Sequence, residues 1–241
     1  MMRSGNPALR ADTFTGARAY DSTNVMTIDG TVNKTFGLLF LTVLFASWAW
    51  NNPTRFIPWM LPLILGGFIV AMVTFFKKEW AGITSPIYAG LEGLFLGTIS
   101  VMMEKMYPGI VIQAVMLTFG TLFCLLLAYK SKLIKVTDNF RLGVVAATGG
   151  IALIYFITII LGFFGKNIPF IHESGPIGIG FSVFVVIIAS LNLVLDFDFI
   201  EQGAESGAPK YMEWYGAFGL MVTLIWLYLE ILRLLAKSRR K

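Results

Sequence analysis

The stretch SVFVVIIASLNLVLDFDFIEQGAESGAPKYMEWYGAFGLMVTLIWLYLE, residues 182–230, decides the fold. Two long apolar runs flank a short polar loop, which predicts two membrane-crossing helices joined as an antiparallel hairpin. Among the carboxylates in or beside these runs are Asp196, Asp198, Glu213 and Glu230. A charge within a membrane helix is costly and normally faces a cavity or a partner. These carboxylates are therefore the main functional clue.

Composition indicates the same class for the whole chain. Of the 241 residues, 56% are hydrophobic and only 14% are charged, with a mean hydropathy of +0.74. These values predict a polytopic membrane protein. The formal net charge of +5 does not indicate nucleic-acid binding, because the Lys and Arg residues lie between apolar runs and at the termini, where membrane topology explains them.

The hydropathy pattern predicts an all-α polytopic membrane protein with seven transmembrane helices in one domain. Helices are required because lone strands leave backbone groups unpaired in lipid, and the alternating pattern of a barrel is missing. Most runs are long enough to span the hydrocarbon core. The seven runs cover residues 35–50, 57–76, 82–103, 108–129, 142–164, 176–200 and 214–235.

The flanking segments complete the predicted organisation. Residues 1–33 form a flexible cytoplasmic arm, residues 34–236 the transmembrane domain, and residues 237–241 a basic tail. The stretch from Met26 to Thr35 is a candidate cap for the first helix. One cysteine, Cys124, lies in an apolar run, which excludes an intramolecular disulfide and favours a small core residue.

Lys and Arg residues predict a cytoplasmic N-terminus, because they are concentrated in the segments that this orientation places inside. Seven crossings would, however, place the C-terminal cations outside. Either the last segment does not cross fully or the tail tolerates an outward position, and we favour seven crossings. The inner cations are Arg3, Arg10, Arg18, Lys34, Lys77, Lys78, Lys130, Lys132, Lys135, Arg141 and Lys210; the outer ones are Arg55, Lys105 and Lys166; the C-terminal ones are Arg233, Lys237, Arg239, Arg240 and Lys241.

Small residues mark positions where two helices can approach closely. Most tryptophans fall near predicted helix ends, where aromatic rings lie at the membrane interface. The small residues are Gly67, Ala71, Gly93, Gly97, Gly149, Gly150, Gly216 and Gly219, and the tryptophans are Trp48, Trp50, Trp59, Trp80 and Trp214.

Ionisable residues within the runs identify a candidate site. Glu92 lies about 15 Å into the third helix, near the midplane. Asn192 and Asp196 are four residues apart and share one helix face, which predicts an inward polar stripe. Asp198 faces away from Asp196, so we expect a solvated cytoplasmic position for it. Glu213, in the loop, is expected to be solvated as well.

Several motifs resemble one family. LNLVLDFDFIEQG (191–203) and LYLEILRLLAKS (227–238) resemble the C-terminal signature of the Bax inhibitor-1 family, which includes YccA-like bacterial members. NVMTIDGTVNKT (24–35) and PIYAGLEGLFLG (86–97) resemble a bacterial branch of it. The resemblance implies a bacterial inner-membrane protein with six helices wrapped around a central C-terminal helix. It also implies a pH-dependent Ca²⁺ leak.

That resemblance implies a pore controlled by two aspartates that share a proton. The first falls on Asp196, whereas the second falls on Thr223, so one carboxylate is missing here. Thr223 is about 14 Å deep, almost level with Glu92. Glu92 is therefore a candidate replacement, with Glu230 as a second candidate nearer the outer mouth.

Two carboxylates in a low-dielectric cavity do not both ionise easily, so Asp196 and Glu92 are candidates for a proton-sharing gate and for Ca²⁺ ligands. The alternative for Glu92 is a protonated residue hydrogen-bonded within the bundle. Asn192, Asp198, Glu213 and Glu230 are further pore or ion-binding candidates.

Two functions follow. The first is a pH-sensitive calcium or cation leak channel gated by membrane-embedded carboxylates. The second is a non-conducting membrane interaction protein that modulates a membrane protease or a stress response. Catalysis is not expected, because His172 has no second histidine or cysteine cluster beside it, and no lysine or histidine lies deep in a span. We expect no cofactor, and as partners lipids, protons, Ca²⁺ and a membrane protein.

Overall fold

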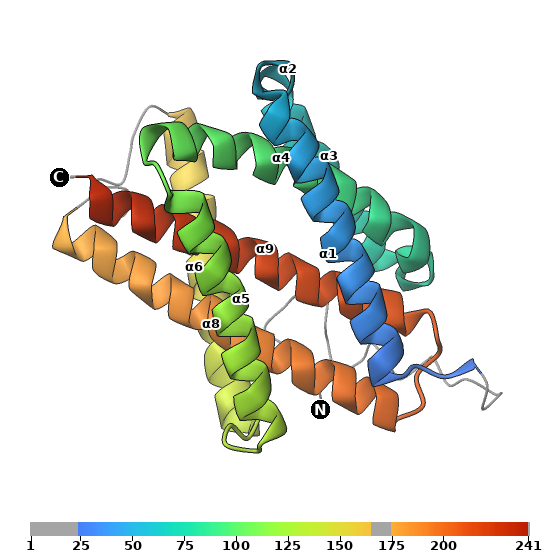
Figure 1. The fold of residues 1–241 in the computed structure, drawn as a ribbon. Helices are drawn as coiled ribbons and strands as arrows, with labels where there is room; N and C mark the ends of the chain where they lie inside the picture. The colour runs from blue at the N-terminus through green and yellow to red at the C-terminus, as the bar shows by residue number, and fades with distance from the viewer. Residues whose placement is uncertain (1–23, 165–174, 241) are drawn as a thin grey trace.

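The computed structural model describes residues 24–164 and 175–240, and within them seven helical segments are long and apolar enough to cross a membrane. This confirms the predicted fold class (Figure 1). The helices are α1 (Ile28–Asn51), α2 (Pro53–Phe56), α3 (Met60–Phe76), α4 (Ala81–Met106), α5 (Ile110–Lys130), α6 (Asp138–Phe163), α8 (Pro176–Glu205) and α9 (Met212–Arg239), with 3₁₀ turns η3 (Ile57–Trp59) and η4 (Lys78–Trp80).

Local sequence explains where these helices begin. The hydroxyl of Thr27 caps α1 by accepting a hydrogen bond from the Gly30 N–H at 3.0 Å. Thr137 caps α6 in the same way through the Phe140 N–H at 3.2 Å. Such caps satisfy backbone donors that the helix itself leaves unpaired. Between α4 and α5, Gly109 adopts a positive φ of 79°, a conformation that glycine tolerates best and that allows a short turn.

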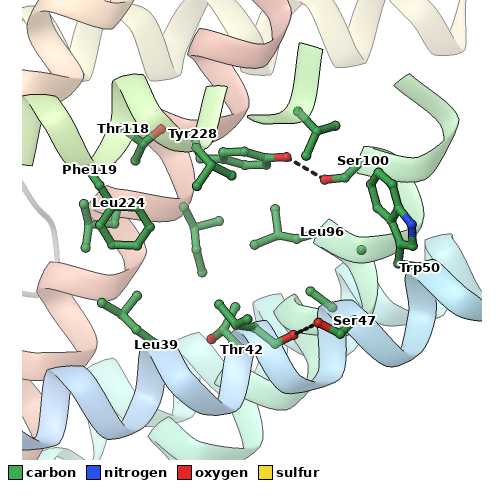
Figure 2. Close-up of a pocket in the computed structure, with 16 residues that line it drawn as sticks. Leu39, Thr42, Ser47, Trp50, Leu96, Ser100, Thr118, Phe119, Leu224 and Tyr228 are labelled. Atoms are coloured by element: carbon green, nitrogen blue, oxygen red, sulfur yellow. Dashed lines mark hydrogen bonds between the residues drawn. The ribbon is translucent and has the colours of Figure 1, made fainter. Parts of the chain in front are cut away.

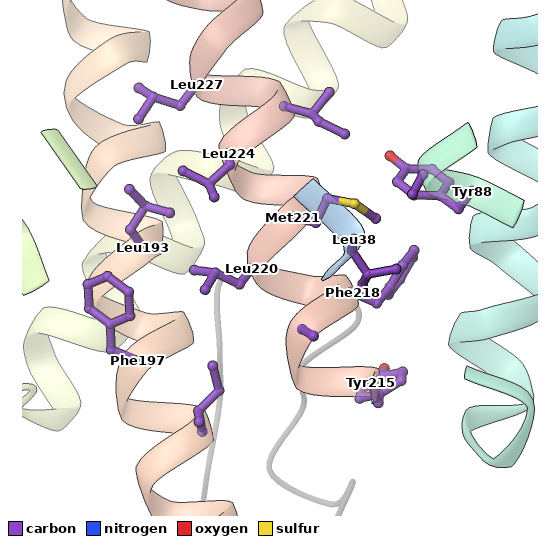
Figure 3. Packing of buried hydrophobic residues seen from close by; sticks show 14 of the residues in the cluster. Leu38, Tyr88, Leu193, Phe197, Tyr215, Phe218, Leu220, Met221, Leu224 and Leu227 are labelled. Atoms are coloured by element: carbon purple, nitrogen blue, oxygen red, sulfur yellow. The ribbon is translucent and has the colours of Figure 1, made fainter. Parts of the chain in front are cut away.

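Helix α9 lies at the centre of the bundle. Of its most apolar window, 67% is buried, against at most 44% for any other span. It packs mainly against α8, α1, α5 and α4. Figure 3 shows Phe218, Met221 and Leu224 of α9 among side chains of these neighbours, with Leu193 of α8 on one side and Tyr88 of α4 on the other. The central C-terminal helix that the family resemblance implied is therefore present.

Helices α1 and α4 pack most closely at two glycines. A Cβ on Gly93 would lie 2.5 Å from the Thr42 carbonyl oxygen, and one on Gly97 would lie 2.7 Å from the Ala46 Cα. Both predicted packing positions are confirmed. Gly149 and Gly150 of α6 differ, because no atom of the described residues comes within 4 Å of a Cβ at either position. The packing prediction for these two residues is wrong.

Some predicted boundaries also change. Helix α1 begins at Ile28, so residues 28–33 belong to the bundle and not to the N-terminal arm. Helix α9 continues to Arg239, well into the predicted tail. Cys124 is exposed on α5 and is not a core residue. The rest of the predicted arm, residues 1–23, lies outside the described residues, as does His172.

Candidate functional site

Asp196 is a fully buried carboxylic acid on α8, with 0% of its surface exposed. The next turn of α8 contacts the central helix, since a Cβ on Gly216 of α9 would lie 3.3 Å from Cγ1 of Ile200. Farther along the same pair, Lys237 of α9 donates to the Ser182 hydroxyl of α8 at 2.8 Å. The two helices are thus antiparallel neighbours. Asp196 lies one turn before Ile200 on α8, so it is level with Gly219 and Leu220 of α9.

Thr223 occupies the neighbouring turn of α9. Its side chain is buried, and its hydroxyl donates to the Gly219 carbonyl oxygen at 3.3 Å. The antiparallel register with α8 places it opposite Leu193, less than one turn from the level of Asp196. The two positions that the family resemblance connects are therefore close in this fold, and here the second one carries a hydroxyl group.

Asn192 adds a third polar group at this depth. Its amide nitrogen donates to the Thr148 hydroxyl of α6 at 2.8 Å and to the Ile188 carbonyl oxygen at 2.8 Å. Its Oδ1 atom is buried and has no hydrogen-bond partner among the described residues. The amide oxygen thus remains available to accept a proton donor or a cation. Asn192 and Asp196 are both buried, one helical turn apart, as the sequence predicts.

Glu92 lies at the same depth but beside another helix. Tyr88 of α4 stacks edge-on against Phe218 of α9, with ring centroids 5.1 Å apart, and Ser100 of α4 bonds Tyr228 of α9 at 2.6 Å. Glu92 falls between these two contacts, so it is level with the residues just before Thr223. A Cβ on Gly67 of α3 would lie 2.7 Å from its Oε1 atom.

The structure does not bring Glu92 and Asp196 together. Helix α8 packs chiefly against α9, whereas α4 packs against α1, α3 and α9. Helix α9 stands between α4 and α8, with side chains such as Phe218 and Met221 (Figure 3). The Glu92 carboxyl interacts with the Tyr88 hydroxyl. This arrangement matches the alternative reading of Glu92, a carboxyl group hydrogen-bonded within the bundle. Proton sharing with Asp196 would require a different arrangement of α9.

Polar contacts continue from this site toward the C-terminal end of α8. Asp198 accepts from the Arg141 guanidinium at 2.5 Å and from the Gln202 amide at 2.6 Å, and Glu201 accepts from the Tyr129 hydroxyl. The prediction of a solvated Asp198 is wrong, because its side chain is only 15% exposed. It faces α6 because Arg141, far away in sequence, supplies a counter-charge there.

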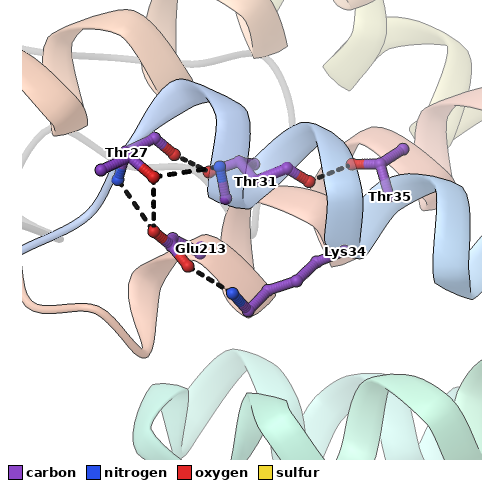
Figure 4. Close-up of polar contacts among 6 residues, drawn as sticks. Thr27, Thr31, Lys34, Thr35 and Glu213 are labelled. Atoms are coloured by element: carbon purple, nitrogen blue, oxygen red, sulfur yellow. Dashed lines mark hydrogen bonds and ion pairs between the residues drawn. The ribbon is translucent and has the colours of Figure 1, made fainter.

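Glu213 was also expected to be solvated, and this prediction is wrong as well, because the residue is 1% exposed. Its carboxylate accepts from the backbone N–H and the hydroxyl of Thr27, each at 2.9 Å, and forms an ion pair with Lys34 (Figure 4). A Cβ on Gly30 would lie 2.6 Å from Oε2, so a larger residue there would displace the Glu213 carboxylate. We call Thr27, Lys34 and Glu213 the N-terminal latch.

Backbone contacts reinforce the N-terminal latch. Val25 forms an isolated antiparallel bridge with Pro209 in the loop between α8 and α9. The Met26 N–H donates to the Ala208 carbonyl at 2.7 Å, and Met26 is itself buried. The segment before α1 therefore covers the first turn of the central helix.

Glu230 lies toward the opposite end of α9 and is buried. Its carboxylate accepts from the Tyr155 hydroxyl of α6 at 2.9 Å and from Arg233 at 3.0 Å. Glu230 therefore forms a structural ion pair with Arg233 and a hydrogen bond with Tyr155. In the same region, Lys237 donates to the Gly178 carbonyl at 3.0 Å, and Arg239 donates to the Pro108 carbonyl at 2.7 Å.

These carboxylates are dispersed through the bundle. Among residues 24–164 and 175–240, no group of three or more His, Cys, Asp or Glu side chains is placed to hold a metal ion. The predicted Ca²⁺ ligands Asp196 and Glu92 therefore do not form a preassembled metal cage.

In the part of the chain that the structure describes, seven apolar helices form a bundle with acidic side chains buried beside its central helix, and this arrangement defines a polytopic membrane protein. The sequence matches the family described as Bax inhibitor 1 like over residues 6–240. The chain belongs to this family, as its motifs predicted. A search of curated proteins finds no match.

Proposed function

We propose that this protein is a pH-sensitive leak for cations, chiefly Ca²⁺, in which Asp196 is the titrating group. The observation that supports this best is the complete burial of the Asp196 carboxyl group at the contact between α8 and the central helix. Membrane-embedded carboxylates are expensive and typically mark ion or proton pathways. We also place the protein in a bacterial inner membrane with its N-terminus in the cytoplasm.

The arrangement supports a closed resting state. Asp196 is sealed from water between α8 and its neighbours, and a charge in such surroundings is costly. Loss of the Asp196 proton would create that charge and favour a state in which α8 and α9 separate enough to admit water. The Thr223 hydroxyl and the Asn192 amide oxygen would then join the carboxylate as hard oxygen ligands of the kind that Ca²⁺ accepts.

Ca²⁺ uptake into liposomes containing the purified protein tests this proposal between about pH 5 and pH 8. We expect flux that rises with pH in the parent, because ionisation of Asp196 opposes the sealed state. Asp196→Asn should remove this response, since an amide does not ionise. Glu205→Gln is the matched control, because Glu205 is exposed at the end of the same helix, and it should behave as the parent does.

Two outcomes contradict the proposal. If folded protein passes no Ca²⁺ above empty liposomes at any pH, the leak proposal fails and the result favours the alternative, a non-conducting interaction protein that modulates a membrane protease or a stress response. If Asp196→Asn conducts with an unchanged pH response, a different group titrates.

Glu92→Gln addresses the second carboxyl group separately. In the structure Glu92 contacts Tyr88 and lies against Gly67, away from Asp196. We therefore expect this substitution to leave the midpoint of the pH response in place, while the Asp196 variant abolishes it. A loss of the response in both variants would instead show that the two groups act together in the conducting state.

A further inference from the structure

A cavity of about 300 Å³ lies between α1, α4, α5 and α9 (Figure 2). Its volume is at the lower end of the range for ligand pockets. Its lining is almost wholly apolar and includes Leu39, Leu96, Phe119 and Leu224. None of the carboxylates of the candidate site lines it, so it is a separate feature of the bundle.

The cavity opens sideways from the bundle. Val43 on its α1 edge is 57% exposed, and Ser47, one turn farther along, is exposed too. The floor is formed by Thr42, Thr118 and Leu224, which are buried. Because all four helices belong to spans, the rim faces the lipid phase, and only molecules dissolved in the membrane reach it.

One end of the cavity carries a polar group. The hydroxyls of Ser100 and Tyr228 bond each other at 2.6 Å, and Figure 2 shows this pair on the same side as Trp50, whereas Leu39 and Phe119 lie at the other end. The hydrogen bond between the two hydroxyls uses one of their two protons, so the other proton can be donated to a ligand oxygen. Trp50 lies one residue before the end of α1, so the polar end is the one nearer a membrane surface.

The length and volume of the cavity determine which kind of molecule fits in it. From Leu39 to Trp50 the lining follows α1 for about 16 Å, at 1.5 Å per residue. A single helical turn with its side chains occupies roughly 400 Å³, from the diameter and pitch of a helix, and is therefore larger than the whole cavity. A helix of a second copy does not fit, whereas a thin, unbranched chain does.

We propose that the cavity binds one acyl chain of a membrane lipid. The tail lies against Leu39 and Phe119, and the ester carbonyl accepts a hydrogen bond from the Ser100–Tyr228 pair. This inference does not depend on ion conduction.

Photo-crosslinking in liposomes tests the site. A phospholipid with a diazirine at the end of one acyl chain should label the peptide containing Leu224, a residue that the surrounding bilayer does not reach. A diazirine near the ester should label Trp50 or Ser100 instead. Val115→Trp, which places a large ring in the cavity, should lower labelling of the floor by about tenfold, a typical effect of blocking a buried contact surface.

Leu117→Trp is the matched control, because Leu117 is on the same helix but is 49% exposed and does not line the cavity. Its floor labelling should equal that of the parent, and both variants should unfold at the parent's temperature. Labelling confined to exposed residues, or equal floor labelling in both variants, would show an ordinary lipid annulus and overturn the proposal. Crosslinks between two copies through α1 or α5 would overturn it as well.

Tyr228→Phe tests the polar contact. An unlabelled ester lipid should compete about fivefold less well in this variant, as expected for loss of one hydrogen bond. An ether lipid, which lacks the carbonyl, should compete equally in both proteins. Equal competition by the ester lipid would show that the hydroxyl pair does not contact the ligand.

Discussion

At the scale of residues, the buried carboxylates differ in the partners that the fold gives them. Glu213 accepts three hydrogen bonds within the N-terminal latch, one of them from the Lys34 ammonium. Asp198 and Glu230 each face an arginine. Glu92 contacts a tyrosine hydroxyl, and Asp196 is the most completely buried of the five. The ion-paired carboxylates stabilise helix contacts, whereas the proposed function assigns the titrating role to Asp196.

The N-terminal latch leads to a stability prediction. Glu213→Gln should lower the free energy of unfolding by about 2 kcal/mol, because Lys34 loses its counter-charge in a partly buried site. Thermal unfolding in detergent, followed by tryptophan fluorescence, measures the change. Glu205→Gln removes an exposed carboxylate from the end of α8 and should leave the midpoint unchanged.

A double-mutant cycle separates the ion pair from other effects of the Glu213 substitution. Once Lys34→Met is present, Glu213→Gln should cost less than it does alone, since the charge that it would strand is already gone. Strictly additive costs would mean that Glu213 acts through Thr27 and not through Lys34.

Sequence reasoning located Asp196 and Glu92 because a charge in an apolar run is visible without a structure. It failed for Glu213 because the partners that bury it, Thr27 and Lys34, are 186 and 179 positions away. It failed for Asp198 for the same reason, since Arg141 is 57 positions away. For Cys124, hydropathy alone does not distinguish a lipid-facing position from a core position, because both are apolar.

At the scale of elements, glycine spacing decides how closely helices approach. Gly97→Ala should destabilise the bundle by about 1–3 kcal/mol, because a Cβ there would meet the Ala46 backbone, which cannot rotate away. Gly149→Ala on α6 meets no neighbouring atom of the described residues and should leave stability unchanged or raise it slightly. Thermal unfolding of the two variants in one detergent makes the comparison. Equal effects would mean that the α1–α4 contact relaxes easily.

Helix number and most helix ends could be predicted, because apolar length is a strong signal in a membrane protein. The start of α1 was missed by several residues, since IDGTVNK is polar and hydropathy does not register it. There the Thr27 cap and the buried Met26 extend the helix beyond its apolar part. The end of α9 was missed similarly, because Lys237 and Arg239 are helical and bonded to backbone carbonyls.

At the scale of the whole molecule, these C-terminal contacts concern a conflict in the charge pattern. Lys and Arg residues normally mark the cytoplasmic side, yet with the proposed cytoplasmic N-terminus seven crossings would place the C-terminal cluster outside. Lys237 is buried against the first turns of α8, and Arg239 reaches the turn between α4 and α5. The N-terminal segment instead contacts the loop between α8 and α9. The two ends of α9 therefore lie at opposite ends of the bundle, and three of the C-terminal cations, Arg233, Lys237 and Arg239, have structural partners.

This geometry predicts opposite exposure for two positions in the membrane. In a Cys124→Ser background, Ser238→Cys at the end of α9 should react with a membrane-impermeant maleimide added to intact cells. Glu205→Cys at the end of α8 should react only after the membrane is permeabilised. Both native residues are exposed in the structure, so burial does not limit either reaction. The reverse pattern would show an outward N-terminus. Reaction of both cysteines in intact cells, or of neither, would place both ends of α9 on one side, which a membrane-crossing central helix does not permit.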